Sequence, residues 1–561
     1  MAIVGIDLGT TNSCVAICRE GETDVLENNF GKRTTPSFLA YTQDGWIYGE
    51  EAKDQITLNP ANTFFDMKRL LGREFADECV QNDIKYWPFK VVDDHDQIAV
   101  QIEGESPTKL CKVQEITAKF LKHLKTQAEN ALGEEIQEAV ITVPAYFNDR
   151  QRNATIEAGR IAGLKVRHII NEPTAAGIAY QTESEAVSQR KMLVYDLGGG
   201  TFDVSIIAYD GKEFVVKATA GDAHLGGEDF DDQLVKECLR DINERLKNSI
   251  KNNPSAMQRL RTACENAKCI LSARCETTID LESLDEEEDF HKRITRARFE
   301  EINSNLFQKT IDIVQKTLEN ANLRPENIDD VLLVGGSTRV PKVQEMLISF
   351  FNNRRLNHCV NPDEAVAIGA AKVAASFKPE LSLTEGPKTP QSEIPNPKID
   401  YRSSLSEPES DQVEGHRRDE LIVLDGPQPL VIRDLVPFSL CVQVRNRKTD
   451  TIIPRYTNVP IKRTKRYRTT NDNQSCVRIS IYEGESGDVD HSHRLGEFVL
   501  SGITQAPKGQ VNILVAFQID LNGIFKVTAT EDHGEAKKEI TIMNDAGRLS
   551  EEEIRRLTEQ N

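Results

Sequence analysis

The feature of this sequence that most constrains its fold is a short pattern that occurs twice. It reads IDLGTTNSCVAI at residues 6–17 and YDLGGGTFDVSII at residues 195–207. In each copy an apolar run ends in Asp-Leu-Gly, small or hydroxyl residues follow, and a second apolar run begins, which predicts a hairpin with a tight turn. Around the hairpins, from Ile3 to about Phe377, strand and helix patterns alternate. This region is long enough for two α/β lobes.

The turns of the two hairpins carry residue types that bind phosphate. Their glycines let backbone amides come close to a ligand, and consecutive exposed N–H groups form a concavity that attracts anions. Carboxylates at the strand ends suit a hydrated Mg²⁺ that bridges phosphate oxygens. The pair therefore predicts a clamp for a nucleoside triphosphate. The hydroxyl donors are Thr10, Thr11 and Thr201, and the carboxylates are Asp7, Asp196 and Asp203.

Other readings of these residues compete with the clamp. One hairpin alone would more often be an ordinary glycine turn, and only the pairing of two favours a phosphate site. The chain has no GxxxxGK[ST] motif and no GxGxxG motif that opens a helix, so neither a P-loop nor a dinucleotide fold explains the site. Further candidates are weaker, because each alone would be read as a solvated surface or a simple turn. They are VLLVGGSTRVPKV at 331–343, Lys68, Glu172, and Glu265, Lys268 and Ser272 on successive helical turns.

The composition disfavours several classes of protein. The formal net charge of −20 argues against nucleic acid as a main partner, although KRTKRYR at 462–468 is locally basic. No apolar run approaches the ~18 residues of a membrane span, and the first residues do not resemble a signal peptide. Eleven scattered cysteines without metal-ligand spacing predict reduced thiols. We therefore expect a cytoplasmic protein, with the nucleus left open as a second compartment.

The pattern changes in the last third of the chain. Residues 378–420 combine many Pro, Ser and acidic residues with a single aromatic residue, which predicts a disordered linker. Residues 421–543 show short strands without long helices, and Asn522-Gly523 between two alternating runs is a strong hairpin signal. We expect an all-β domain there, followed by an amphipathic helix that begins near Ser550.

A series of longer motifs resembles one known family. The motifs occur in one order at family-like spacing, so the series is far more specific than any single motif. The chain resembles the seventy-kilodalton heat-shock protein chaperones, as a divergent and lidless member, from Ile3 to about Phe377 and again from about Leu430 to the end. The motifs are IDLGTTNS, RLLGR, VITVPAYFND, INEPTAA, YDLGGGTFDVS, HLGGEDFD, ITRARFEE, VGGSTRVPKVQ, NPDEAVAIGAA, DNQSCVRISIYEGE and GRLSEEE.

The resemblance implies a domain order and an activity. It implies an α/β actin-like (ribonuclease H-like) two-lobed ATPase domain at 1–377, a disordered insertion with the interdomain linker at 378–434, an all-β sandwich that binds peptides at 435–545, and the start of a truncated lid helix at 546–561. The activity would be slow ATP hydrolysis, weakly coupled to peptide exchange, with ATP or ADP, Mg²⁺ and K⁺ as cofactors. The implied partners are unfolded or extended polypeptides, J-domain co-chaperones and nucleotide exchange factors, without nucleic acid or membrane.

The family's nucleotide-site roles are carried over by matching motifs. Lys68 would position the attacking water and the γ-phosphate, and Glu172 would help to hold the water shell of Mg²⁺. These two residues, with Asp7, Asp196 and Thr201, form the implied catalytic set, while Asp7, Asp196 and Asp203 would organise Mg²⁺ and K⁺, partly through water. The residues implied to bind the nucleotide are Gly9, Thr10, Thr11, Asn12, Gly199, Gly200, Thr201, Glu265, Lys268, Ser272, Gly336, Ser337, Arg339 and Asp363.

The resemblance also implies a peptide cleft in the β domain. Val477 and Ile479 alternate along one strand and therefore face the same side, as a pocket wall requires. Periodicity alone favours the sandwich core for such residues, and only the resemblance favours a cleft. The matching residues are Val442, Tyr467, Thr470, Gln474, Val477, Ile479 and Ile513.

Several residues depart from the family pattern. Arg433 stands where the linker has its last Leu, and burial of this cation would weaken coupling unless it is paired. A second aliphatic run at 421–424 looks linker-like but is displaced along the chain. His168 replaces an Arg that contacts J-domain co-chaperones, Cys269 replaces an Arg that stacks on adenine, and Arg445 replaces an apolar residue at the arch over the peptide cleft.

These departures leave two rival functions open. One is a nucleotide-binding regulator that sequesters co-chaperones and has no efficient chaperone activity. The other is a sugar kinase on the same actin-like fold, which the C-terminal β domain disfavours. A peptide titration with and without ATP separates the chaperone from the regulator.

Overall fold

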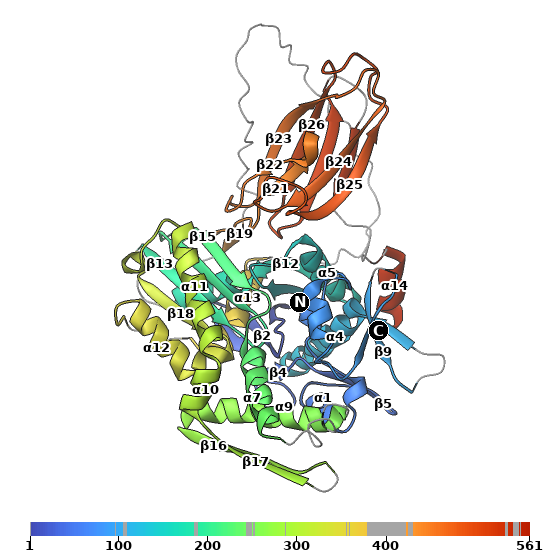
Figure 1. The fold of residues 1–561 in the computed structure, drawn as a ribbon. Coiled ribbons are helices and arrows are strands. Elements are labelled where there is room, and N and C mark those ends of the chain that lie inside the picture. Colours follow the sequence, from blue (N-terminus) through green and yellow to red (C-terminus); the bar gives the residue numbers. More distant parts are fainter. Residues whose placement is uncertain are drawn as a thin grey trace.

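The structure is a computed structural model with a large α/β body and a β-sandwich beside it (Figure 1). The expected fold class is therefore confirmed. The structure describes residues 2–560 except 96, 105–108, 184–188, 212, 243–249, 251–252, 286–287, 355, 358–359, 378–421, 425–429, 533–536, 542–548 and 550. Most of the predicted insertion at 378–434 thus lies outside the described residues, as does Ser550.

A mixed sheet forms the centre of the first lobe. β1 (Ala2–Asp7) runs parallel to β11 (Ile136–Val143) and antiparallel to β2 (Asn12–Arg19). The β1–β2 pair is the first predicted hairpin. The sheet is completed by β12 (Lys165–Asn171), β3 (Glu22–Val25) and β4 (Thr35–Pro36), and α4 (Val113–Leu132) and α5 (Asp149–Ile161) belong to the same lobe.

Two smaller sheets extend the first lobe. They pack with its central sheet and helices around one hydrophobic cluster that includes Phe64 and Leu121. The first sheet contains β6 (Gly45–Tyr48), β5 (Leu39–Thr42) and β7 (Thr63–Phe64), and the second contains β10 (Lys109–Lys112), β9 (Ile98–Ile102) and β8 (Lys90–Asp93). The short helices of this part are α1 (Gly49–Asp54), α2 (Met67–Leu70) and α3 (Glu78–Asp83).

The second lobe repeats the arrangement of the first. β13 (Arg190–Leu197) runs parallel to β18 (Asp330–Val334) and antiparallel to β14 (Phe202–Tyr209), so it forms the second predicted hairpin. β15 (Glu213–Asp222) continues the sheet. The other elements are α7 (Gly227–Asp241), α9 (Pro254–Ala273), the hairpin of β16 (Glu276–Asp285) and β17 (Glu288–Thr295), α10 (Arg296–Ile302), α11 (Ser304–Asn320) and α12 (Pro341–Phe350).

Two helices cross between the lobes. α13 (Ala365–Ala375) packs on β1 and β2 of the first lobe, and α6 (Glu172–Glu183) packs on β13 and β14 of the second. At the crossing, a Cβ atom on Gly369 would lie 1.8 Å from the carbonyl oxygen of Ala175. Only glycine permits so close an approach of two helix backbones. The crossing fixes the distance between the lobes and therefore the width of the space between their hairpin turns.

The C-terminal β domain is a sandwich of two antiparallel four-stranded sheets around its own hydrophobic cluster. The Asn522-Gly523 turn joins β26 to β27 as expected, and Gly523 adopts a φ of +76°. One sheet contains β22 (Thr449–Ile453), β21 (Leu440–Gln443), β24 (Cys476–Glu483) and β25 (His493–Ser501), and the other contains β23 (Ile461–Arg468), β26 (Asn512–Ile519), β27 (Phe525–Glu531) and β28 (Lys537–Thr541).

Three segments join the sandwich to the α/β body. β20 (Leu430–Arg433) pairs in parallel with β15, and β19 (Ile422–Leu424) pairs with β20, so both strands extend the sheet of the second lobe. The second aliphatic run is therefore an extra strand of the α/β body and does not belong to the predicted all-β domain. The helix expected near the C-terminus is α14 (Glu551–Gln560), and its Ile554 and Leu557 pack in the hydrophobic cluster of the first lobe.

Candidate active site

A cavity of about 460 Å³ lies between the two lobes, and the turns of both predicted hairpins line it. The turns approach each other closely, because a Cβ atom on Gly199 would lie 1.9 Å from the Thr11 hydroxyl oxygen. A Cβ atom on Gly9 would lie 1.9 Å from the carbonyl oxygen of Asn12. Glycine at these two positions therefore permits the tight first turn and the close approach of the two turns.

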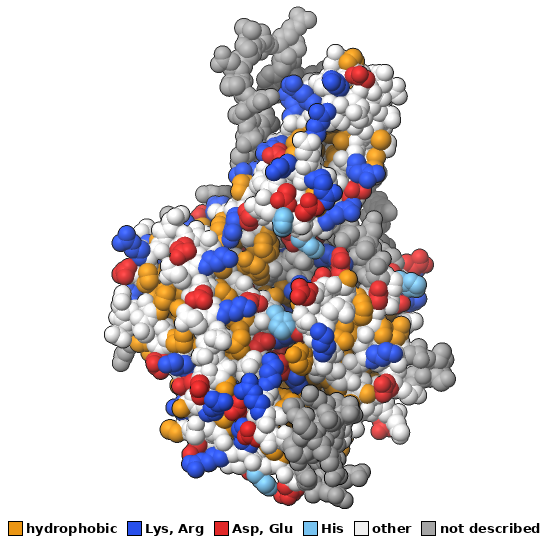
Figure 2. Space-filling model, viewed as in Figure 1, with side chains coloured by type: hydrophobic (Ala, Val, Ile, Leu, Met, Phe, Trp, Pro, Cys, Tyr) orange, Lys and Arg blue, Asp and Glu red, His pale blue; other side chains and the backbone are white. Residues whose placement is uncertain are grey.

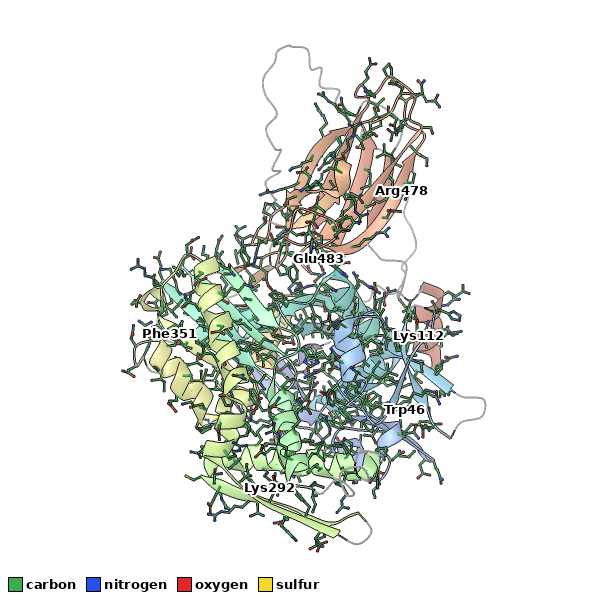
Figure 3. All side chains as sticks on the ribbon, in the orientation of Figure 1. Trp46, Lys112, Lys292, Phe351, Arg478 and Glu483 are labelled. Atoms are coloured by element: carbon green, nitrogen blue, oxygen red, sulfur yellow. The ribbon has the colours of Figure 1, made fainter. Side chains whose placement is uncertain are left out.

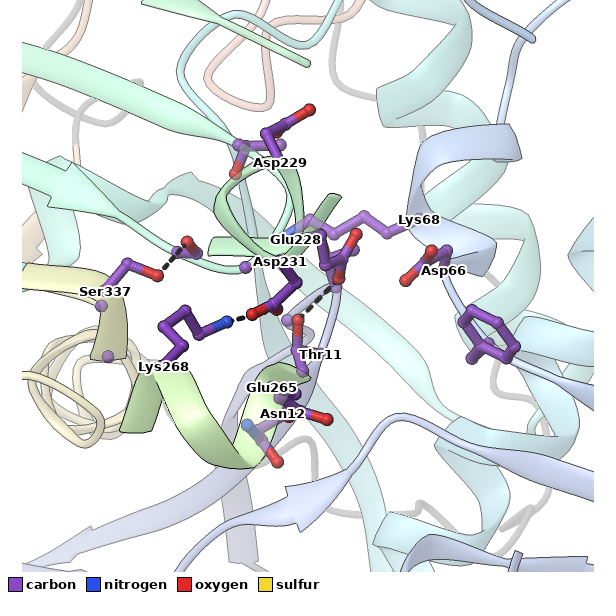
Figure 4. Close-up of a pocket in the computed structure, with 18 of the residues that line it drawn as sticks. Thr11, Asn12, Asp66, Lys68, Glu228, Asp229, Asp231, Glu265, Lys268 and Ser337 are labelled. Carbon is purple, nitrogen blue, oxygen red and sulfur yellow. Dashed lines mark hydrogen bonds and ion pairs between the residues drawn. The ribbon is translucent and has the colours of Figure 1, made fainter. Parts of the chain in front are cut away.

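The N-terminus of α7 closes one side of the cavity. The backbone N–H of Glu228 donates to the carbonyl of Gly199 at 2.9 Å, and the Glu228 carboxylate accepts a hydrogen bond from the Thr11 hydroxyl at 3.0 Å (Figure 4). The second hairpin turn and the first helix turn of α7 thus form one rigid unit. The first N–H groups of α7 are thus used to hold the second hairpin turn in place beside the cavity.

A buried ion pair lies at the centre of the site. The Lys68 ammonium of α2 donates to Glu172, the first residue of α6, at 2.5 Å, and both side chains are less than a tenth exposed. Asp7 lies nearby and accepts a hydrogen bond from Thr142 at 3.1 Å. Because Lys68 has its charge held in place by Glu172, it is positioned to orient a ligand oxygen or a water.

The carboxylates around Lys68 outnumber the cations. Burial, followed by the Glu172 charge, raises the pKa of Asp7 to about 7 and the pKa of Asp203 to about 8. Burial also raises the pKa of Asp196 well above its ordinary value, with Glu172 again the next contributor. Such a group of oxygen ligands favours a bound cation, which would remove the mutual repulsion.

The donor set fits a hydrated Mg²⁺ better than a directly coordinated metal. Among the residues that the structure describes, no group of three His, Cys, Asp or Glu side chains is close enough to hold a metal ion by itself. Mg²⁺ commonly keeps several waters and binds through one or two carboxylates and substrate phosphates. Asp7, Asp196 and Glu172 can serve such an ion through water.

The far end of the cavity is built from α9 and the glycine cluster after β18. Lys268 donates to the Gly227 carbonyl at 3.1 Å and forms an ion pair with Asp231, and Ser337 donates to the Gly198 carbonyl at 2.8 Å (Figure 4). Arg339 pairs with Asp363 at 2.5 Å. The residues of α9 and of the glycine cluster that were implied to bind the nucleotide therefore line the same cavity as the two hairpin turns.

The structure places nearly all predicted nucleotide residues on the cavity wall. Gly200 and Asp203 are not among its lining residues: Gly200 lies against Arg69 and Thr10, and Asp203 is buried on β14 opposite Asp196. The predicted residues that line the cavity are Asp7, Gly9, Thr10, Thr11, Asn12, Lys68, Glu172, Asp196, Gly199, Thr201, Glu265, Lys268, Ser272, Gly336, Ser337, Arg339 and Asp363.

Other lining residues were not predicted. Arg69 is almost fully buried and forms an ion pair with Glu228 at 3.0 Å, which ties α2 of the first lobe to α7 of the second. Lys53 of α1 pairs with Glu265 of α9 at 3.1 Å and joins the two lobes at the cavity wall. Arg69 lies inside the quoted motif RLLGR, and Glu228 lies inside HLGGEDFD. Membership of these motifs was the only feature of the sequence from which the two residues could have been predicted. Cys269 also lines the cavity.

The predicted peptide residues lie on one half of the sandwich. Val442, Ile479 and Ile513 are buried in the sandwich core. Tyr467 and Val477 are partly buried against that core. Thr470 is exposed and Gln474 is partly exposed, and the Gln474 side chain accepts from the Thr470 backbone N–H at 3.0 Å. The set therefore spans the boundary between core and surface.

Arg433 has an ion-pair partner, so the condition under which its burial was expected to weaken coupling is not met. Its guanidinium makes a bidentate ion pair with Glu213 at the start of β15, with distances of 3.1 and 3.2 Å, and the Arg433 side chain stays 37% exposed. The pair forms because β20 docks on β15 with Val431 opposite Glu213. A partly solvated guanidinium with a fork of two hydrogen bonds carries little desolvation cost.

His168 faces the sandwich. Its ring Nδ1 lies 2.7 Å from Oδ1 of Asn522 at the β26–β27 turn, and the same oxygen accepts from the backbone N–H of Ile169 at 3.0 Å. His168 is 5% exposed, and burial lowers its pKa to about 4. In this docked arrangement the neutral imidazole donates to Asn522, and the interface covers it.

No helix in the described part of the chain is long and apolar enough to cross a membrane.

Comparisons with known proteins bear on the whole chain. A model of the family described as Hsp70 protein matches residues 3–385 and 422–561. A "Heat shock 70 kDa protein" of Neurospora crassa is 43% identical over 554 residues, which cover 99% of this chain and 79% of that protein. A "Heat shock cognate 70 kDa protein 3" of Dictyostelium discoideum is 43% identical over 565 residues, covering 100% and 83%.

A third relative carries a more specific name. This "Ribosome-associated molecular chaperone" of Eremothecium gossypii is 43% identical over 558 residues, which cover 99% of this chain and 84% of that protein. The family match and these identities extend through the two lobes that enclose the cavity and through the β-sandwich. This chain therefore belongs to the Hsp70 family of ATP-hydrolysing molecular chaperones.

Proposed function

We propose that this chain binds MgATP between its lobes, hydrolyses it slowly, and couples the nucleotide state to the release of extended hydrophobic polypeptide segments from its β-sandwich. The observation that carries the proposal is the cavity, in which two facing hairpin turns enclose the Lys68–Glu172 ion pair. Family membership supports ATP and unfolded polypeptides as ligands in general. The positions of the residues on the cavity wall support the roles proposed for them.

Each part of the site has a separate task in hydrolysis. The hairpin turns and Thr201 hold the phosphates through backbone and hydroxyl donors, and Lys68 orients the attacking water. Mg²⁺, when bound, neutralises phosphate charge. Asp7, Asp196 and Glu172 order its water shell, and Asp203 and Asp196 favour K⁺ as a second cation. Positioning and electrostatic stabilisation are sufficient for phosphoryl transfer, so no covalent protein intermediate is needed.

Coupling between the nucleotide site and the peptide-binding sandwich would run through β20. The strand is paired with β15 of the second lobe, and the next residue, Asp434, accepts hydrogen bonds from Asn171 at 2.6 Å and Thr174 at 3.3 Å. Thr174 belongs to α6, whose first residue is Glu172. A change at the nucleotide can therefore reach the linker through a single helix. The Arg433–Glu213 pair removes the original reason to expect weak coupling.

We also propose partners and a location for this chain. J-domain co-chaperones and nucleotide exchange factors are expected from the family. His168 at the sandwich interface would offer a J-domain a neutral partner in place of a guanidinium. A cytoplasmic location is proposed, because the eleven cysteines lack a disulfide pattern.

The test is a release experiment on the full chain. A fluorescent leucine-rich peptide is bound in ADP, and its release is followed by anisotropy after addition of ATP. ATP should accelerate release, and Lys68→Ala should still respond to ATP binding while turning over little ATP. Peptide that binds but is indifferent to ATP would favour the nucleotide-binding regulator, and absence of peptide binding would reject the chaperone proposal.

A further inference from the structure

We propose that the β-sandwich of this chain selects hydrophobic segments flanked by Asp or Glu. The proposal rests on the proposed peptide binding and adds the charge of the preferred segments. Its basis is the far end of the sandwich, defined here as the loop 444–448 between β21 and β22 and the loop 469–475 between β23 and β24. Figure 3 shows Glu483 of β24 close to the α/β body and Arg478 of the same strand farther from it.

Apolar surface is available at the far end. Val444, Tyr467 and Val477 pack against the sandwich core but remain only partly buried. The Tyr467 hydroxyl donates to Asp450 at 2.7 Å, which fixes the ring in place. A hydrophobic side chain that covered these three residues would gain burial free energy without displacing any core residue.

Arg445 bridges the two loops above this apolar surface. Its guanidinium donates to the Thr470 carbonyl at 3.1 Å, and both residues are exposed. The loop that carries Arg445 is tightly folded, because Asn446 and Arg447 have φ values of 60° and 56° and the Val444 N–H donates to Lys448 at 2.8 Å. A single hydrogen bond leaves most of the guanidinium donors open to a second acceptor.

The two far-end loops carry more cations than carboxylates, and the neighbouring loop 484–492 places Asp488 beside Lys448 in an isolated β-bridge. In the described part of the sandwich, Arg445, Lys448 and Arg468 take part in no ion pair. Asp472 is the remaining carboxylate of the loops, and it accepts from the backbone N–H of Lys508 at 2.8 Å. The paired groups are Arg447 with Asp490, Lys465 with Asp450, Arg466 with Asp532 and Arg478 with Glu497.

The charge of the whole domain differs in sign from that of the chain. Residues 435–545 contain 15 Lys and Arg against 13 Asp and Glu, whereas the whole chain has a net charge of −20. Figure 2 shows Lys and Arg side chains over the visible face of the sandwich. A peptide approaching the far end therefore meets a positive local field on an otherwise acidic protein.

The three unpaired cations act on the flanks of a bound segment. Carboxylates next to its hydrophobic core can pair with Arg445, Lys448 or Arg468, whereas Lys or Arg at the same positions are repelled. Exposed ion pairs each change affinity by up to about fivefold. The preference must weaken with salt, because the interacting charges are solvent-exposed.

The test uses the full chain in ADP and three peptides of equal length that share one leucine-rich core. Their flanks are Asp, Ser or Lys, and affinities are measured by fluorescence anisotropy at low and high salt. We expect the Asp-flanked peptide to bind at least about tenfold more tightly than the Lys-flanked one at low salt, and the difference to shrink at high salt. Arg445→Met should reduce the ratio about threefold or more.

Arg494→Met is the matched control. It removes one exposed cation of the same domain, on β25, whose Arg494 lies opposite Tyr482 and thus near the end of β24 that faces the α/β body. Equal ratios for the two variants, or a Lys-flanked peptide that binds as well as the Asp-flanked one, would overturn the inference. Failure of the Ser-flanked peptide to bind would instead reject the proposed peptide binding itself.

Discussion

The Lys68–Glu172 pair is the smallest unit on which the proposed activity depends. A buried lysine amid several carboxylates is held by charge, and its removal leaves Glu172 and Asp7 without their nearest cation. Its main contribution is expected in the transition state, where a water must be aligned with the γ-phosphate.

We predict that Lys68→Ala lowers ATP turnover about 100-fold or more while changing MgATP affinity less than tenfold. Single-turnover hydrolysis and calorimetric binding measure the two effects. Thermal stabilisation of the variant by ATP serves as the control for folding. A loss of affinity as large as the loss of turnover would place Lys68 in ground-state binding only.

The second prediction at the residue scale concerns the contribution of the Arg433–Glu213 pair to the docking of β20. Both side chains are about one-third exposed, so the pair is worth at most about 1 kcal/mol. Glu213→Gln should speed amide hydrogen exchange in β20 up to about fivefold in the presence of ATP. Arg433→Leu should have a smaller effect, because the apolar side chain suits a docked strand.

The double variant provides the discriminating measurement. If the two residues interact, Glu213→Gln should have no further effect in the Arg433→Leu background. Additive effects, or an Arg433→Leu variant whose β20 is strongly protected relative to the natural chain, would show that the ion pair does not stabilise docking.

At the scale of elements, β19 covers the outer edge of the linker strand. Val423 pairs with Val431, and the ladder leaves β20 between two neighbours. Val423→Pro fixes φ at about −65° and disfavours the extended backbone of β19, so we predict faster hydrogen exchange in β20 and less ATP-driven peptide release. Val423→Thr keeps a residue that favours extended backbone and is the control. Equal rates of amide hydrogen exchange in β20 of both variants would mean that β19 does not stabilise the docked linker strand.

The sequence predicted the elements that are encoded locally. Both Asp-Leu-Gly hairpins and the Asn522-Gly523 turn were predicted because their glycines and alternating runs specify the turn within a few residues. Glu213 was not predicted as the partner of Arg433, because 220 residues separate them and no local pattern links them. The pairing of β19 with β20 was missed although Val423 and Val431 are close in sequence, because an aliphatic run alone does not show which sheet it joins. Glu265 and Ser337 were assigned to the nucleotide site only because their positions match family motifs, and both line the cavity.

At the scale of the whole molecule, the interface between the lobes and the sandwich contains partly buried acids. Asp149 of α5 accepts from the Phe525 N–H at 2.8 Å, and burial raises the pKa of Asp149 and of Glu483 to about 7. Arg152, Asp434 and Asp520 lie in the same interface, and Arg152 attenuates the shift of Asp149.

These shifts predict that docking depends on pH. When the domains separate, Asp149 and Glu483 return to ordinary carboxyl pKa values of about 4. The two carboxyl groups therefore bind more protons in the docked form, and through them docking should strengthen as pH falls from 8 through about 7. His168 acts in the opposite direction below its ordinary pKa of about 6.5, because burial in the docked form lowers its pKa to about 4. Energy transfer between dyes on the two domains measures the balance. Asp149→Asn with Glu483→Gln should remove the strengthening on acidification, and an unchanged slope in that variant would contradict the assignment.

The C-terminal helix gives the sandwich a second attachment. Ile554 and Leu557 of α14 pack in the first lobe, and Lys112 pairs with Glu553 at 2.9 Å, while β20 holds the other end to the second lobe. The sandwich is thus a bivalent ligand of its own α/β body. When one attachment opens, the other keeps it at a high effective concentration, so single openings close again quickly. The sandwich then separates fully from the α/β body only when both attachments weaken together. Separation should therefore stay rare until both are weakened, and then rise steeply.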